Sequence, residues 1–161
     1  NLSPLPYDSA DDDLGLTRVV QGLYSADEES IYLSPAPLYH SAPMGFNTGF
    51  LALGATSIIL EKFDPEAALE AIEKYKVTHS QWVPTMFIRF LKSDPEIMDK
   101  YDLSTHKIAI HAAAPCPVEV KEKIMRRHGI GLPDVIDFFN DVLDYRRKFA
   151  IKSEMVFGPN E

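Results

Sequence analysis

The sequence has little cysteine and no recognisable export signal, and each of these features excludes some classes of protein. Its 161 residues include a single cysteine, Cys116, so no internal disulfide can form and a small disulfide-stapled secreted domain is excluded. Residues 1–10 carry neither the basic region nor the apolar region of a secretory signal. We therefore predict a reducing, cytoplasmic location.

Basic residues are also in the minority. The chain has 16 Lys and Arg against 24 Asp and Glu, a formal net charge of −8. Non-specific binding to nucleic acid needs a basic surface, so we expect no nucleic-acid partner. Hydrophobic residues make up 45% and charged residues 25% of the chain, which is typical of a globular protein and not of a disordered one.

Charge is absent from three windows of the sequence. Residues 31–60, 77–88 and 108–118 contain no Asp, Glu, Lys or Arg. The first window is long enough to cross a membrane. Its three prolines, three glycines and His40 argue against a spanning helix, so we predict no transmembrane segment. Buried junctions between strands and helices explain the three windows better.

Strand and helix signals alternate four times along the chain. The β-prone runs are residues 31–34, 56–60, 77–83 and 107–110, and helical patterns follow at 43–53, from Pro65, from Pro84 and from Pro117. Asp64 and Asp94 each precede a proline, which is the pattern of a capped helix start. In the helix from Pro65 we expect Leu69, Ile72 and Tyr75 to be buried. The alternation predicts an α/β fold with a mostly parallel, doubly wound sheet.

The C-terminal region has a helical pattern of its own. Five apolar residues recur on one face (Val135, Ile136, Phe139, Val142 and Leu143), acids stand at the start (Asp134 and Asp137) and bases at the end (Arg146, Arg147 and Lys148). Charges in this order match the helix dipole. We predict an amphipathic helix over residues 133–149.

In open α/β sheets, ligands bind beyond the carboxyl ends of the strands. In this sequence the loops at those ends are residues 34–43, 83–85 and 111–117. All three fall within the windows that lack charge. The sequence therefore predicts a binding site built from these loops.

The residue sequence of these loops resembles that of the adenylate-forming acyl-CoA synthetases, and the fatty-acyl-CoA synthetase branch is the most similar. The resembling stretches are Pro37-Leu38-Tyr39-His40, Val77-Thr78 with Val83-Pro84-Thr85, Asp102-Leu103-Ser104, and Ala112-Ala113-Ala114-Pro115. The resemblance covers residues 17–125. It divides the chain into an acidic segment at 1–16, a partial adenylate-forming domain at 17–125 and a divergent tail at 126–161.

The resemblance implies a reaction and a set of site residues. ATP and a fatty or other carboxylic acid would give an acyl-adenylate and pyrophosphate, after which the thiol of CoA displaces AMP, with Mg²⁺ assisting. By resemblance His40, Pro84 and Thr85 line the acyl-adenylate pocket, and Ala112, Ala113, Ala114 and Pro115 line the adenine. The alternative for His40 is a structural histidine, and for the alanine loop it is close packing of a strand on a helix. The histidines lack the spacing of metal ligands, so we predict no metal-binding residues.

Parts of the family pattern are missing from the sequence. It contains no Gly/Ser/Thr-rich phosphate loop with a lysine, no Tyr-Gly-x-Thr-Glu motif and no C-terminal domain with its lysine. His106 stands where the family has an apolar residue. We therefore expect a fragment of the large domain of an acyl-CoA synthetase, inactive alone. The alternative is a non-catalytic remnant or interaction module that exposes an inherited hydrophobic cleft and self-associates through it.

Overall fold

The computed structural model describes residues 15–112, 116–128 and 135–137 of the chain. In chain order their elements are α1 (Gly15–Tyr24), β1 (Ile31–Ser34), α2 (Ser41–Ala52), β2 (Thr56–Ile59), α3 (Pro65–Tyr75), β3 (His79–Trp82), α4 (Pro84–Lys92), α5 (Pro95–Asp99), β4 (Ile108–His111), α6 (Val118–His128) and β5 (Val135–Asp137). None of the helices among these residues is both long and apolar enough to cross a membrane.

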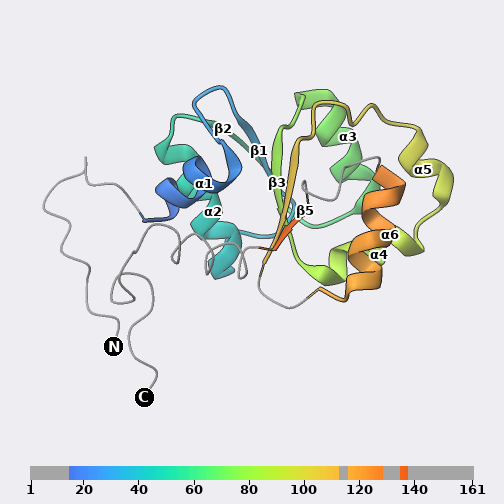
Figure 1. The fold of residues 1–161 in the computed structure, drawn as a ribbon. Helices are drawn as coiled ribbons and strands as arrows, with labels where there is room; N and C mark the ends of the chain where they lie inside the picture. Colours follow the sequence, from blue (N-terminus) through green and yellow to red (C-terminus); the bar gives the residue numbers. More distant parts are fainter. Residues whose placement is uncertain (1–14, 113–115, 129–134, 138–161) are drawn as a thin grey trace, which may run out of the picture.

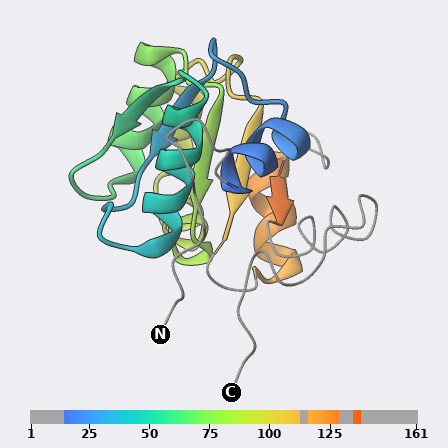
Figure 2. The same cartoon turned by 90° about the vertical axis from the view of Figure 1, so that its left-hand side faces the viewer.

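The strands form one sheet in the order β2-β1-β3-β4-β5, and every neighbouring pair is parallel. Helices α1 and α2 cover one face, and α3 to α6 lie against the other (Figures 1 and 2). This arrangement confirms the predicted doubly wound α/β fold. A parallel sheet needs both faces covered, which explains the long stretches without charge in its strands.

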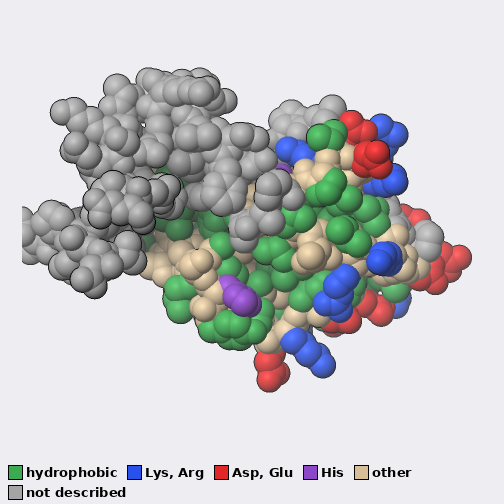
Figure 3. Space-filling model, turned by 90° about the horizontal axis from the view of Figure 1, so that it is seen from below, with side chains coloured by type: hydrophobic (Ala, Val, Ile, Leu, Met, Phe, Trp, Pro, Cys, Tyr) green, Lys and Arg blue, Asp and Glu red, His purple; other side chains and the backbone are tan. Residues whose placement is uncertain are grey.

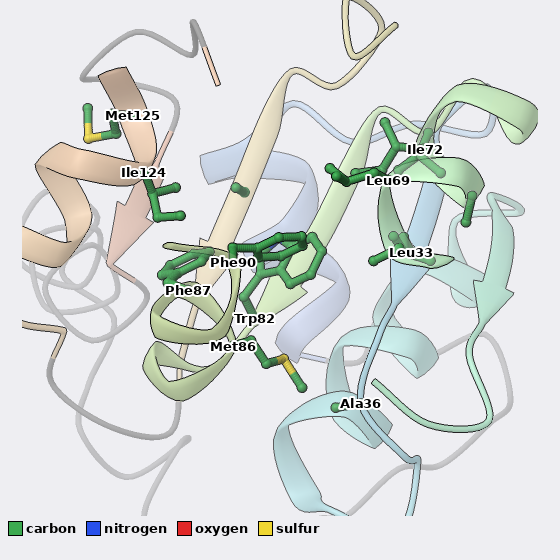
Figure 4. Packing of buried hydrophobic residues seen from close by; sticks show 14 residues of the cluster. Leu33, Ala36, Leu69, Ile72, Trp82, Met86, Phe87, Phe90, Ile124 and Met125 are labelled. Atoms are coloured by element: carbon green, nitrogen blue, oxygen red, sulfur yellow. The ribbon is translucent and has the colours of Figure 1, made fainter. Parts of the chain in front are cut away.

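The larger core is centred on Trp82, between the sheet and helices α3, α4 and α6 (Figure 4). The Trp82 ring lies 5.3 Å from the ring of Phe90 and 6.2 Å from that of Phe87, both on α4. The Trp82 indole N–H donates to Ser80 Oγ at 2.5 Å. Ser80 Oγ is also 2.7 Å from His106 Nε2. His106 is therefore part of a buried polar network that holds the indole.

The second core lies under α1 and α2. The rings of Tyr32 on β1 and Phe50 on α2 stack with centroids 4.4 Å apart. Helix α1 was not expected from the sequence. It packs closely on α2 beside Gly45 and Gly49, one turn apart: a Cβ on Gly45 would lie 3.1 Å from Leu16 Cδ2, closer than ordinary contact, and one on Gly49 would touch the Leu16 carbonyl oxygen at 3.4 Å.

The predicted helix starts are confirmed, but one predicted core residue is wrong. Asp64 Oδ1 accepts a hydrogen bond from the amide of Ala67 at 3.0 Å, and Pro65 occupies the first turn. Tyr75, expected inside, is 42% exposed. The helix ends there because Lys76 adopts a left-handed conformation (φ 54°). The chain then turns back, and the buried Val77 donates its amide to the carbonyl of Ile72, so Val77 enters the core after the last turn.

The C-terminal prediction is also corrected. Residues 135–137, expected at the start of a helix over 133–149, form strand β5, with Val135 opposite Ala109 and Asp137 opposite His111. The edge of β4 offers backbone groups for pairing, and the β-branched Val135 and Ile136 are favourable in a strand. That pairing outweighs the local helical periodicity. The rest of the predicted helix lies outside the described residues.

We expect Leu69→Ala to lower the free energy of unfolding by about 2–5 kcal/mol, because it leaves a cavity in the larger core. Leu69 is 0% exposed, whereas Leu51 on α2 is 52% exposed. Leu51→Ala is therefore the matched control and should change stability by less than about 0.5 kcal/mol. Urea denaturation measures both, and equal losses would contradict the assigned burial.

His79, at the start of β3, ties helix α1 to the sheet. Its Nε2 lies 2.9 Å from the Tyr24 carbonyl oxygen, which can only accept, so Nε2 donates. Its Nδ1 is 2.8 Å from Thr78 Oγ1. Burial lowers the pKa of His79 below its ordinary value of 6.5, and the nearby Lys107 lowers it further, against the opposing effects of the Tyr24 carbonyl and Asp27.

This shift predicts acid sensitivity. Because the folded state disfavours protonated His79, its contribution to stability is complete above pH 6.5 and is lost as the pH falls below that value. We expect the urea midpoint of the wild-type chain to fall from pH 7.5 to pH 5.5 by more than that of His79→Gln. The exposed His40 provides the control, since His40→Gln should retain the wild-type pH dependence. An unchanged slope in His79→Gln would contradict this assignment.

Candidate functional site

The carboxyl ends of the strands form the candidate site. Strand β1 leads into α2 on one face of the sheet, and the neighbouring β3 leads into α4 on the other. The chain therefore diverges between the ends of β1 and β3, and such a point is where open α/β sheets bind ligands. The arrow of β5 points down in Figure 2, so Figure 3, seen from below, shows this edge of the parallel sheet.

His40 lies on this edge, at the N-terminus of α2. Its backbone is extended (φ −86°, ψ 144°), and its carbonyl oxygen accepts from the amide of Met44 at 3.1 Å. The imidazole makes no capping hydrogen bond, is exposed, and contacts the Tyr39 ring at 4.4 Å. The His40 imidazole therefore lies at the carboxyl edge of the sheet and does not cap helix α2.

Pro84 and Thr85 follow the end of β3. Val83 precedes α4 in an extended conformation (φ −115°), and Pro84 begins the helix. A proline is favoured there because its missing N–H would be unpaired in any residue at that position. Pro84 is buried and Thr85 is exposed, so of these two residues Thr85 presents its side chain to the solvent.

The alanine loop begins where β3 and β4 separate. The amide of Ala112 donates to the carbonyl of Trp82 at 3.1 Å, and Ala112 is buried. Ala113, Ala114 and Pro115, predicted beside it, lie outside the described residues. On the neighbouring strand, the Ser34 hydroxyl donates to the carbonyl of Ala36 at 3.1 Å, which fixes the start of the loop toward His40.

The sequence prediction missed Gln81, the buried residue before Trp82 on β3. Its amide nitrogen donates to the Trp82 carbonyl at 2.8 Å, the same oxygen that pairs with Ala112. The available signal was the residue type itself, because a glutamine within a fully buried parallel strand requires partners for its amide.

The three loops of the candidate site carry no charged residue. Figure 3 shows hydrophobic side chains gathered across this edge of the sheet, with acidic and basic side chains toward the right-hand side and the lower rim. The loops at 34–43, 83–85 and 111–117 contain no lysine or arginine. Among the described residues no three His, Cys, Asp or Glu side chains group to hold a metal ion. The edge thus suits the apolar and aromatic parts of a ligand, and its three loops offer no cation to phosphates.

Residues 14–139 match the family model for AMP-binding enzymes, so the chain belongs to that family. The match includes β5, which lies beyond the 17–125 range of the resembling motifs. Over 99 residues the chain is 41% identical to the putative acyl-CoA synthetase YngI of Bacillus subtilis (strain 168), covering 60% of this chain and 17% of that protein. It is 28% identical over 147 residues to the peroxisomal OPC-8:0-CoA ligase 1 of Arabidopsis thaliana, covering 85% and 27%.

Solved structures share the fold. The amide bond synthetase McbA of Marinactinospora thermotolerans superposes with a TM-score of 0.64 at 24% identity, over 74% of this chain and 23% of that chain. ATP-bound MatB of Rhodopseudomonas palustris gives 0.58 at 20% identity, over 70% and 22%. The chain therefore spans about a quarter or less of each of these proteins.

Two helix starts allow a direct stability comparison. Asp64 caps α3 through its carboxylate, whereas His40 precedes α2 without a side-chain cap. We expect Asp64→Ala to lower the free energy of unfolding by about 0.5–2 kcal/mol and His40→Ala to change it by less than about 0.5 kcal/mol. Thermal denaturation of both variants checks this. A large loss in His40→Ala would show that the imidazole supports the fold.

Proposed function

We propose that this chain forms part of the carboxylate-activating domain of an AMP-forming acyl-CoA synthetase, acting on a fatty or other carboxylic acid. Family membership and the acyl-CoA and CoA ligase names of its relatives support the proposal. The observation that carries it is the meeting of the uncharged, motif-bearing loops at one edge of the sheet, with His40 exposed and Ala112 buried. In the proposal His40, Pro84 and Thr85 border the acyl-adenylate pocket, and Ala112 with the three residues after it borders the adenine.

The proposed reaction explains why such an edge is useful. A carboxylate oxygen attacks the α-phosphorus of ATP, the bond to pyrophosphate breaks, and an acyl-adenylate forms. The CoA thiol then attacks the acyl carbon and releases AMP. Because the first step is a displacement between bound reactants, positioning supplies much of the rate enhancement. An apolar wall holds the acyl chain, small residues let the flat base approach the backbone, and His40 contacts the group that joins them.

Phosphate charge must be neutralised by groups outside these three loops. Mg²⁺ supplies that chemistry when bound, and in the proposal both Mg²⁺ and CoA are bound by the complete enzyme. Since the sequence has neither the Gly/Ser/Thr-rich loop nor the Tyr-Gly-x-Thr-Glu motif, we propose that the 161-residue chain is inactive by itself.

The test places residues 14–139 in a complete enzyme. In YngI, the matching segment is replaced by these residues, and carboxylate-dependent ATP–pyrophosphate exchange is measured. We expect the chimera to retain exchange, and His40→Ala in the chimera to reduce it by roughly 100-fold, the scale of a lost positioning contact. The isolated chain should show no exchange.

Lys92→Ala is the control, because this exposed residue ends α4, away from the carboxyl edge. It should leave the chimera's exchange rate unchanged. A folded chimera without exchange, or one insensitive to His40→Ala, would contradict the proposed role. Exchange by the isolated chain above its own His40→Ala variant would contradict the proposed inactivity.

A second candidate is a non-catalytic chain that associates with its own copies. It is favoured by the outer face of α2, where Met44 is 48% and Leu51 52% exposed. We expect size-exclusion chromatography to show an oligomer that Met44→Glu/Leu51→Glu converts to a monomer. A wild-type monomer at high concentration would exclude this candidate.

A further inference from the structure

Gln81 is a polar side chain buried within the sheet. It is 0% exposed on β3 and pairs with Ile110 of β4. His79, two residues earlier, faces α1 and α2, since its ring lies 5.3 Å from that of Phe50. Alternate residues of a strand share a face. The Gln81 side chain therefore faces the α1 and α2 side of the sheet.

Its position along the strand is at the candidate site. Leu33 pairs with Ser80, so Gln81 stands beside Ser34, the last residue of β1. On its other side, β4 ends one residue after the partner of Gln81, and Ala112 follows. Gln81 thus lies between the start of the loop to His40 and the start of the alanine loop.

The two ends of the Gln81 amide differ in their partners. Nε2 donates to the Trp82 carbonyl at 2.8 Å, which identifies it as the nitrogen because a carbonyl accepts only from a donor. Oε1 is buried and has no hydrogen-bond donor among the described residues. A buried acceptor without a donor is costly, because it has lost its water and gained nothing in return. The sheet therefore holds, beside the candidate site, a buried oxygen that requires a donor.

We propose that Gln81 is a specificity-determining residue of the carboxyl-edge site, and that its Oε1 accepts a hydrogen bond from an N–H or O–H group of the bound molecule. This inference rests on the proposed function. The Trp82 carbonyl holds the amide in one orientation, so the oxygen is preorganised. The donor comes either from the amino group of adenine or from a hydroxyl on the tail of the carboxylic acid.

Two pairs of probes distinguish these sources. The 161-residue chain is titrated with adenosine and with purine riboside, which lacks the amino group, and with decanoate and 10-hydroxydecanoate. Nuclear magnetic resonance spectra report binding. We expect the donor-bearing member of one pair to bind about tenfold more tightly, the scale of one net hydrogen bond. The pair that shows the preference identifies the source.

Gln81→Met should abolish the preference, because it keeps the length of the side chain and removes the oxygen. The chain's other glutamine, Gln21, is exposed on α1, so Gln21→Met is the matched control and should keep the preference. In the wild-type chain, the side-chain amide signals of Gln81 should shift when the preferred probe is added. That measurement tests the contact between Gln81 and the probe even if Gln81→Met fails to fold.

The outcomes separate this inference from the function on which it rests. Binding without a preference in either pair, a preference that persists in Gln81→Met, or unmoved Gln81 amide signals would overturn the role of Gln81 alone. A buried water molecule would then be the donor to Oε1. Absence of binding by all four probes would overturn the proposed site, and this inference with it.

Discussion

The parallel pairing of β1 with β3 is the constraint on which the remaining structure depends. Tyr32 lies opposite His79 and Leu33 opposite Ser80. This short register aligns the carboxyl ends of two strands whose paired residues are 47 positions apart in the sequence. After β1 the chain enters α2 on one face of the sheet, and after β3 it enters α4 on the other face, so both faces of the sheet are covered. The candidate site lies where these two paths diverge.

The same pairing creates two cores with different characters. Toward α3, α4 and α6, aromatic rings gather around Trp82. The indole N–H, the one polar group of the Trp82 side chain, donates a hydrogen bond to Ser80. Toward α1 and α2, the polar atoms are more numerous, with His79 and Gln81 both pointing from β3. On the α4 side of β3, aromatic rings of neighbouring elements surround Trp82 and make that face mainly apolar. The face that carries His79 and Gln81 is the more polar one, and it lies on the side of α2, which follows the loop of His40. A ligand between the ends of β1 and β3 would meet loops that carry no charge and a strand face that is not wholly apolar.

Sequence reasoning succeeded where the cause was local. Asp64 and Asp94 cap helices because the carboxylate reaches amides two or three residues ahead, and that geometry needs nothing from the rest of the chain. It failed where distant backbone decided. Helix α1 follows an acidic stretch and forms on α2, where two glycines admit it. Residues 135–137 join β4 as a strand although their periodicity is helical, since pairing satisfies backbone groups that local pattern cannot detect.

The sequence by itself determined the class of fold, the family resemblance and the three loops that lack charge. Each depends on the order and types of residues along the chain: alternating strand and helix signals, prolines after aspartates, and short motifs at spacings that suit a parallel sheet. Only the tertiary structure decided which side chains share the edge. It exposed His40, buried Ala112, and left the oxygen of Gln81 without a described donor. The physical reason is that burial and hydrogen-bond satisfaction depend on strands brought together from distant parts of the chain, and no local pattern specifies them.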